Sequence, residues 1–173
     1  MIKNLSYTLR EAKVEDAAIL VKAEKEIAKM PGFLVSRPTE LIQELFEATI
    51  IECNIDHQGK YLVAEKDNKI IGHGFLSPLE LKAVSHVASL TLVVHTGSQR
   101  QGVGSAILGE LITWAKNSSK IDKIQLHVRA TNEGAVALYL KHGFIQEGRL
   151  LKKIKISDDY YLDDLAMGLW VKK

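Results

Sequence analysis

A glycine-containing turn joins a predicted buried strand to a predicted helix near the middle of the chain, and this junction most constrains the fold. The stretch HVASLTLVVH, residues 86–95, is apolar on both alternations, which is typical of a central strand buried on both faces. Beyond the turn, apolar residues recur at helical spacing over about 14 residues from Val103. The junction therefore predicts a central strand that passes directly into a helix packed on a sheet.

Other hydrophobic patterns predict further elements on both sides of this junction. Strand patterns occupy residues 7–12, 60–66, 69–77, 123–128, 148–157 and 160–171. Helical patterns occupy residues 14–30, 37–53 and 132–144. Thr39 is the predicted N-cap of the second helix, Gly143 the predicted stop of the last one, and Asp67-Asn68 a predicted hairpin turn.

The resulting order of elements is β-α-α-β-β-β-α-β-α-β-β, which gives the fold class as α/β with a mixed (α+β) sheet. Helices on both sides of the 123–128 strand imply parallel crossovers within a mostly antiparallel sheet. The chain contains no internal repeat and no linker-like stretch, so residues 1–173 are expected to form a single domain.

Composition narrows the classes of function. Apolar residues make up 46% of the chain and the net charge is only +2, so no strong field draws it to nucleic acid. No run of about 18 apolar residues could cross a membrane, and the N-terminus has no signal-peptide pattern, so we expect a cytoplasmic protein. Cys53 is the single cysteine and the histidines lack metal-ligand spacing, so neither a disulfide nor a metal site is expected.

The glycines of the turn, Gly102 and Gly104, admit two interpretations. They permit a tight turn with close helix–strand packing, or they let the backbone approach a phosphate. In the second case the amides from Arg100 to Ser105 converge on the phosphate at the positive end of the helix dipole. A dinucleotide-binding fingerprint is disfavoured because Ile107 stands where its third glycine is required.

Two motifs in this region resemble those of the GNAT (GCN5-related) N-acetyltransferases. QRQGVG, residues 99–104, matches the pattern Q/R-x-x-G-x-G/A, and NEGAVALYLKHGF, residues 132–144, matches the second motif of that family. The resemblance is closest over residues 86–148. It implies the GNAT fold, with acetyl-CoA as the acetyl donor and a central parallel strand pair that splays around the pantetheine arm.

The resemblance also implies a set of cofactor-binding residues. Backbone groups of the central strand bind the pantetheine arm, the turn binds the pyrophosphate, and Asn132 lies near the cofactor or simply caps its helix. The residues predicted to bind the cofactor are Leu92, Val93, Val94, Gln99, Arg100, Gln101, Gly102, Val103, Gly104, Ser105 and Asn132.

Tyr139 and the backbone amide of Val94 are the predicted catalytic groups. By resemblance, Tyr139 protonates the departing CoA thiolate and the amide stabilises the oxyanion. Transfer from a phenol to a thiolate is uphill by roughly 2 kcal/mol at ordinary pKa values, so hydrogen-bond donation is the alternative role. Core packing is the other interpretation of Tyr139.

The general base cannot be carried over from the family. Ala88 stands where some family members have a glutamate, so ordered water, His86 or an acid of the closing hairpin are the alternatives. Cys53 lacks a histidine partner in any recognisable motif and is interpreted as a structural thiol, which leaves direct attack by the amine.

The acceptor side is expected to lie between the loop MPGFLVSRP, residues 30–38, and the closing hairpin. The candidates to bind an ammonium-bearing acceptor are Phe33, His86, Tyr161 and Asp163, together with Tyr160 and Asp164. A solvated hairpin turn is the alternative interpretation of DDYYLDD.

The sequence therefore predicts an acetyl-CoA-dependent N-acetyltransferase whose acceptor is a small-molecule or amino-acid-like amine. A protein N-terminus or lysine is the alternative acceptor, and a non-catalytic acyl-CoA-binding sensor is the alternative function. No nucleic-acid or membrane partner is expected, and a homodimer would be in keeping with the family.

Overall fold

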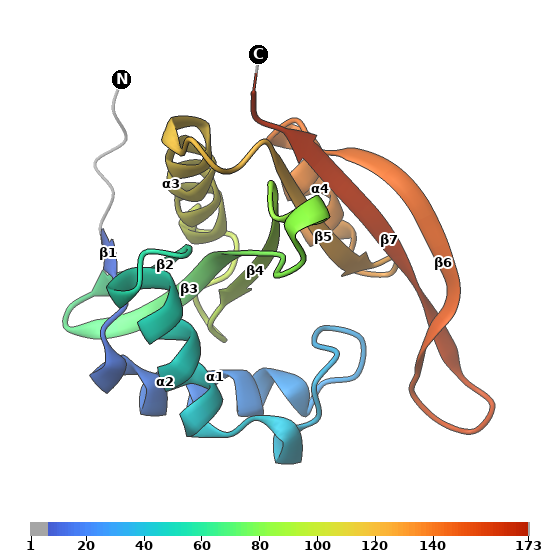
Figure 1. Ribbon diagram of the computed structural model, residues 1–173. Coiled ribbons are helices and arrows are strands. Elements are labelled where there is room, and N and C mark those ends of the chain that lie inside the picture. The colour runs from blue at the N-terminus through green and yellow to red at the C-terminus, as the bar shows by residue number, and fades with distance from the viewer. Residues whose placement is uncertain (1–6, 173) are drawn as a thin grey trace.

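The computed structural model describes residues 7–172, which form a seven-stranded mixed sheet with helices on both faces (Figure 1). The strand order is β1-β2-β3-β4-β5-β7-β6. The strands are β1 (Thr8–Glu11), β2 (Lys60–Lys66), β3 (Lys69–Pro78), β4 (Val87–Val94), β5 (Lys123–Arg129), β6 (Ile145–Lys155) and β7 (Tyr161–Trp170). The helices are α1 (Ala17–Ala28), α2 (Gln43–Ile50), α3 (Val103–Asn117) and α4 (Glu133–Lys141). This order confirms the predicted fold class.

Short helical turns account for the differences at the ends of the first two predicted helices. The 3₁₀ turn η1 (Val14–Asp16) precedes α1, and the π-helical turn η3 (Ile51–Ile55) follows α2. The remaining 3₁₀ turns are η2 (Pro38–Glu40) and η4 (Lys82–Val84). No helix within residues 7–172 combines the length and apolar character needed to cross a bilayer.

The prediction that Thr39 caps the second helix is wrong. Thr39 lies inside η2, where the Glu40 carboxylate accepts the Arg37 N–H at 2.7 Å and closes a separate turn. Pro38 favours this short turn because its fixed φ suits the first position of a helix. The chain is extended again at Leu41, so α2 begins only after Ile42.

The predicted hairpin turn at Asp67-Asn68 is confirmed. Both residues have positive φ, +49° and +59°, as a two-residue type I′ hairpin turn requires. The closing hairpin is also present, but β7 rather than β6 pairs with β5, so β6 forms the edge of the sheet. Sequence alternation identified both strands without showing which one lies inside.

Two hydrophobic cores lie on opposite faces of the sheet. One core packs α3 and α4 residues, among them Ile107 and Tyr139, against the strands. The other core packs α1 and α2 residues, among them Leu20 and Ile50, against Val63 and its neighbours. Figure 1 shows these helix pairs on the two sides of the sheet.

The β4–β5 pair is the parallel pair of the sheet, and its hydrogen-bonded register is short. Only Val87, Ala88 and Ser89 have partners in β5, at residues 123–125. From Leu90 onward β4 has no ladder partner in β5, although β3 pairs with β4 from Ala88 to Val94. This separation confirms the predicted splayed central pair.

Candidate functional site

The turn between β4 and α3 presents free backbone amides at a helix N-terminus. Arg100 and Gly102 both have positive φ, +60° and +85°. Gly102 is the N-cap of α3, no side chain caps the helix, and its carbonyl accepts the Ala106 N–H at 3.0 Å. The amides of residues 103–105 therefore have no partner from a preceding helical turn, and they lie at the positive end of the dipole, which suits a phosphate.

The two glycines of the turn serve different physical purposes. A Cβ on Gly102 would meet only the Tyr7 hydroxyl, 3.7 Å away, so this glycine is required by its left-handed backbone rather than by crowding. A Cβ on Gly104 would lie 3.2 Å from a Val94 methyl and 3.4 Å from a Leu138 methyl. Gly104 therefore lets α3 pack closely on β4, so the tight turn and the close helix–strand packing are both present, each at a different glycine.

The unpaired edge of β4 exposes backbone groups beside this turn. The His95 N–H donates to the Ile71 carbonyl at 3.0 Å, so alternation directs the backbone groups of Leu92 and Val94 away from β3 and toward β5. Those of Val93 point to β3 instead. Because β5 does not pair with this part of β4, the Leu92 groups and the Val94 N–H are available to an extended ligand.

The two glutamines of the turn, both predicted to bind the cofactor, form hydrogen bonds within the turn itself. Gln99 accepts the Gly97 N–H at 2.9 Å and directs its amide to the Val94 carbonyl at 3.4 Å, while Gln101 donates to the Gly97 carbonyl at 3.1 Å. The Val103 side chain is buried in the core, so only its amide faces the turn. The side chains of these three residues stabilise the shape of the turn.

Tyr7 is a residue of this site that sequence reasoning did not find. Its hydroxyl is buried, lies beside Gly102, and has no hydrogen-bond partner among residues 7–172. Burial raises the pKa of Tyr7, so the hydroxyl is a neutral donor at neutral pH. It precedes the edge strand β1, far from the motifs in sequence, and only the fold brings it to the turn.

Tyr139 lies in α4, buried in the same core as α3. Its ring packs against Phe144 with centroids 5.6 Å apart, and the side chain is 7% exposed. Burial raises the pKa of Tyr139 to about 12, so the hydroxyl keeps its proton across the neutral range. No described residue hydrogen-bonds to this hydroxyl, which leaves the donor free.

Two other predicted cofactor residues hold the ends of α4. The Asn132 side chain accepts the Ala135 N–H at 3.2 Å, which confirms that it caps the helix. Ser105 Oγ lies 2.8 Å from His142 Nε2 and joins the start of α3 to the end of α4. Burial, and secondarily the charge of Lys141, lowers the pKa of His142, so its neutral ring accepts a hydrogen bond from the Ser105 hydroxyl.

The loop after α1 reaches the closing hairpin, as predicted for the acceptor side. A Cβ on Gly32 would lie 3.3 Å from a Leu162 methyl and 4.0 Å from Thr131 Oγ1. Phe33 is exposed in this loop and Tyr161 is exposed at the start of β7. The loop and the hairpin are therefore neighbours (Figure 1).

Asp163, another predicted acceptor residue, is occupied by contacts with β6. It accepts a hydrogen bond from Arg149 Nε at 2.8 Å and one from the Lys152 N–H at 2.7 Å. These bonds, the backbone one foremost, lower the pKa of Asp163. Alternation places Asp163 on the face of β7 opposite to Asp164.

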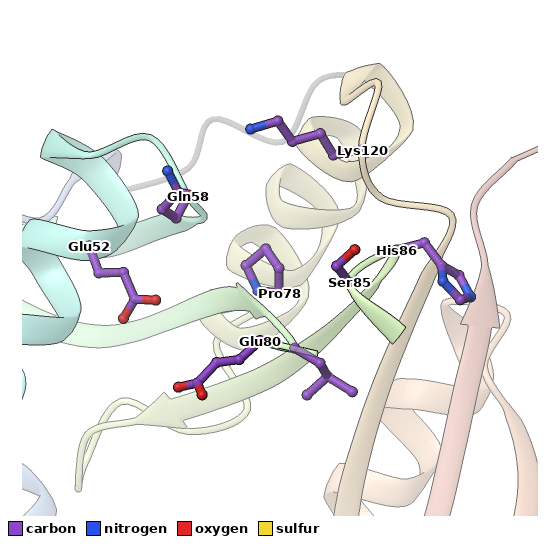
Figure 2. Close-up of a pocket in the computed structure, with 8 residues that line it drawn as sticks. Glu52, Gln58, Pro78, Glu80, Ser85, His86 and Lys120 are labelled. Carbon is purple, nitrogen blue, oxygen red and sulfur yellow. The ribbon is translucent and has the colours of Figure 1, made fainter. Parts of the chain in front are cut away.

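His86 lies apart from the other candidates. It precedes β4 and lies eight residues before Val94 along an extended chain, which is about 26 Å at about 3.3 Å per residue. Its ring packs edge-on against Trp170, and it lines a cavity of about 600 Å³ with Glu52, Glu80 and Lys120 (Figure 2). This cavity is at the end where β4 and β5 remain paired, and no predicted cofactor residue lines it.

A buried chain of polar side chains braces the end of β4. Glu24 of α1 lies 2.8 Å from His73 Nε2, His73 Nδ1 lies 3.0 Å from His95 Nε2, and His95 Nδ1 bonds to the Ile70 carbonyl at 2.9 Å. A carbonyl can only accept, so His95 carries its proton on Nδ1 and accepts from His73. Burial, aided by His73, lowers the pKa of His95 to about 4, which keeps that ring neutral.

Cys53 is confirmed as a structural thiol. It is 1% exposed, its sulfur lies 3.7 Å from the Leu76 carbonyl, and burial raises its pKa to about 12. A thiol that remains protonated inside the core is not a nucleophile at neutral pH.

Comparison with known proteins places these features in a family context. A model of the acetyltransferase (GNAT) family matches residues 26–144. The L-amino acid N-acetyltransferase AaaT of Escherichia coli (strain K12) is 34% identical to this chain over 109 residues, which are 63% of this chain and 67% of the relative.

Solved structures show the same fold. The acetyltransferase of GNAT family from Streptococcus pneumoniae has a TM-score of 0.87 at 29% identity, with 95% of this chain and 99% of that chain covered. A phosphinothricin acetyltransferase of the GNAT superfamily from Sinorhizobium meliloti, solved in complex with AcCoA, has a TM-score of 0.85 at 17% identity, with 96% and 89% covered.

Proposed function

Because this chain belongs to the GNAT acetyltransferase family and is an acetyl-CoA-dependent N-acetyltransferase, we propose that it acetylates the α-amine of a small amino-acid-like acceptor. The amine attacks directly while both substrates are bound. The E. coli relative, which is named for L-amino acids, supports this acceptor class, and the contacts within the site support the mechanism.

The observation that carries the proposal is the separation of β4 from β5 beside a glycine turn. The separation leaves the backbone groups of Leu92 and the N–H of Val94 without a strand partner, and the amides of residues 103–105 lie at the adjoining end of α3. An extended arm with amide groups fits the strand edge, and a pyrophosphate fits the turn. These features fit the pantetheine arm and the pyrophosphate of coenzyme A.

Within this arrangement two groups of the chain are proposed to act on the reaction. Acetyl-CoA supplies the activated thioester when it is bound. The Val94 N–H donates to the oxygen on which negative charge develops. Tyr139 donates its free hydroxyl to the departing sulfur. With the Tyr139 pKa at about 12, full proton transfer to a thiolate of ordinary pKa would cost about 5 kcal/mol, so hydrogen-bond donation is its role.

The lack of a carboxylate at position 88 supports an α-amine as acceptor. Ala88 is fully buried against α3, so this part of β4 provides no proton acceptor. Deprotonation at pH 7 costs roughly 1.4 kcal/mol for the α-amine of a peptide chain and about 4.6 kcal/mol for a lysine-like amine, and the α-amine of a free amino acid, beside its own carboxylate, lies between the two. A site without a strong base there therefore favours the less basic amine.

Release of CoA thiol from acetyl-CoA, measured with a panel of acceptors, tests the proposal. The panel contains free amino acids, polyamines, aminoglycosides and short peptides, each at the same concentration, and a reaction without amine as the control. We expect the highest kcat/KM with a free amino acid. Turnover confined to peptides or polyamines would refute the acceptor class, and binding of CoA without turnover of any amine would favour the sensor function.

A further inference from the structure

A buried ion pair between Arg129 and Asp164, the latter an acceptor candidate from the sequence, lies at the carboxyl end of β5. Arg129 is the last residue of β5, and Asp164 stands directly opposite it in β7. Arg129 Nη1 and Asp164 Oδ1 are 2.9 Å apart, and the two side chains are only 4% and 2% exposed. Charged side chains are rarely buried so completely, so this pair requires an explanation.

The pair lies on the face of the sheet that the acceptor loop covers. Ile124, Leu126 and Val128 point into the core with α3, so alternation places Arg129 on the other face. Leu162 and Thr131 are two residues from Asp164 and Arg129, respectively, and both lie against Gly32 of the loop. The ion pair therefore neighbours the place where the loop meets β5 and β7.

The ion pair leaves much of its hydrogen-bonding capacity unused. Arg129 Nε and Nη1 and Asp164 Oδ1 are buried and have no hydrogen-bond partner among residues 7–172, because the contact between them is close but poorly aligned. Burial lowers the pKa of Arg129 and raises that of Asp164. For both groups, the free-energy cost of burying the charge exceeds the stabilisation that the oppositely charged partner provides.

A structural ion pair elsewhere in the chain behaves differently. Arg10 makes a two-point contact with Asp16 at 2.7 and 3.0 Å and a further bond with Glu65 at 2.7 Å. These bonds raise the pKa of Arg10, and they lower that of Asp16 despite its burial. Full pairing of this kind is what stabilises a fold, and Arg129 and Asp164 do not show it.

We propose that Arg129 and Asp164 select acceptors that carry a carboxylate beside the amine. The guanidinium of Arg129 donates to the acceptor carboxylate, and the carboxylate of Asp164 accepts from the acceptor ammonium. A zwitterion supplies a partner for each group, and both partners lie within the reach of a free α-amino acid because the two groups are in contact. This inference rests on the proposed function and names the acceptor feature that the site recognises.

The test compares one free amino acid with its own α-carboxamide. The amino acid used is the one with the highest turnover, and kcat/KM is measured for both compounds with the full-length protein. The carboxamide keeps the side chain and has a less basic amine, so amine basicity cannot explain a preference for the acid. We expect a preference for the free acid of about 10- to 100-fold, the range of a charge-assisted pair.

The double variant R129M/D164L removes both charges with side chains of similar size, so no charge is left buried alone. We expect it to keep its melting temperature and its CoA affinity, to turn over both acceptors more slowly because Asp164 no longer holds the amine, and to lower the acid-to-amide ratio to about 1. Arg129→Lys keeps the charge without the planar fork, and an intermediate ratio is expected. Arg149→Met, which breaks the exposed pair with Asp163, is the matched control and should leave the ratio unchanged.

The outcomes separate this inference from the proposed function. If R129M/D164L folds and keeps the wild-type ratio, the ion pair is purely structural and the inference is overturned. Wild-type turnover of amines with no preference for the free acid would also overturn it, while leaving N-acetylation of amines intact. Failure of every amine in the panel would instead refute the proposed function.

Discussion

Replacing Gly102 with alanine perturbs the phosphate-binding turn without introducing a clash. The nearest atom to the new Cβ would be the Tyr7 hydroxyl at 3.7 Å, which is an ordinary contact. The φ of +85° is left-handed, and an L-residue pays about 1–2 kcal/mol to adopt it. The substitution is therefore expected to destabilise the CoA-bound folded protein by about 1–2 kcal/mol relative to the unfolded chain and free CoA.

This loss can be located by two measurements on the same variant. Chemical denaturation gives the change in the free energy of unfolding without CoA, and calorimetry gives the change in the CoA dissociation constant. If the CoA-free protein keeps the left-handed turn, the free energy of unfolding without CoA decreases by this amount. If the turn relaxes to another conformation in the CoA-free protein, CoA binding weakens instead, and about 1–2 kcal/mol corresponds to a 5- to 30-fold rise in Kd.

Gly134→Ala is the matched control, because Gly134 lies in α4 with no atom within 4 Å of the new Cβ and no positive φ. It should stabilise the protein by about 0.5–1 kcal/mol and leave CoA affinity unchanged. A Gly102→Ala protein with both stability and CoA affinity unchanged would refute the reasoning, since a left-handed turn would then not be needed to hold the cofactor.

Further predictions concern three buried side chains. Tyr139→Phe should lower kcat about 10- to 100-fold with little change in CoA affinity, measured by thiol release and calorimetry, and an unchanged kcat would remove the role proposed for the hydroxyl. Cys53 has a pKa of about 12, so a fraction of only about 10⁻⁴ of the thiol should be ionised at pH 8. It should therefore resist alkylation until the protein is unfolded, as measured by mass spectrometry. Fast labelling of the folded protein would contradict its burial. The pKa of His95 is about 4 in the folded protein and near 6.5 in the unfolded chain, so between these values the unfolded chain binds more protons. The contribution of the neutral His95 ring to stability is therefore complete above pH 6.5. About 3 kcal/mol of it is lost as the pH falls to 4. His95→Asn should flatten that part of a denaturation profile, and an identical profile in both proteins would refute the assignment.

Local signals were sufficient to predict the elements of the fold. Hydrophobic periodicity located the strands and helices, and Asp67-Asn68 located a hairpin because a type I′ turn selects such residues. The N-cap at Thr39 was wrong because Pro38 and Glu40 close a turn of their own before α2 begins. Whether a separate turn forms before the helix depends on the backbone conformation around Leu41. The residue preferences for an N-cap do not describe that conformation.

The parts of the site that depend on non-local pairing could not be predicted from the sequence. Arg129 and Asp164 meet only because β7 inserts between β5 and β6, and the alternation of β7 does not specify its neighbours. Tyr7 reaches Gly102 by way of the edge strand. Gly102 and Gly104, by contrast, were identifiable from their spacing, although only the structure assigns a backbone role to one and a packing role to the other.

N-acetylation of an amino acid by this protein is tested by detecting the acetylated product itself. The protein is incubated with acetyl-CoA and a free L-amino acid, and mass spectrometry and a thiol assay follow the N-acetylated amino acid and CoA together. The two products should appear in equal amounts, at a rate that depends on the concentrations of both substrates. Binding of CoA without any acetylated amine, across amino acids, polyamines and peptides, would contradict N-acetylation by this protein.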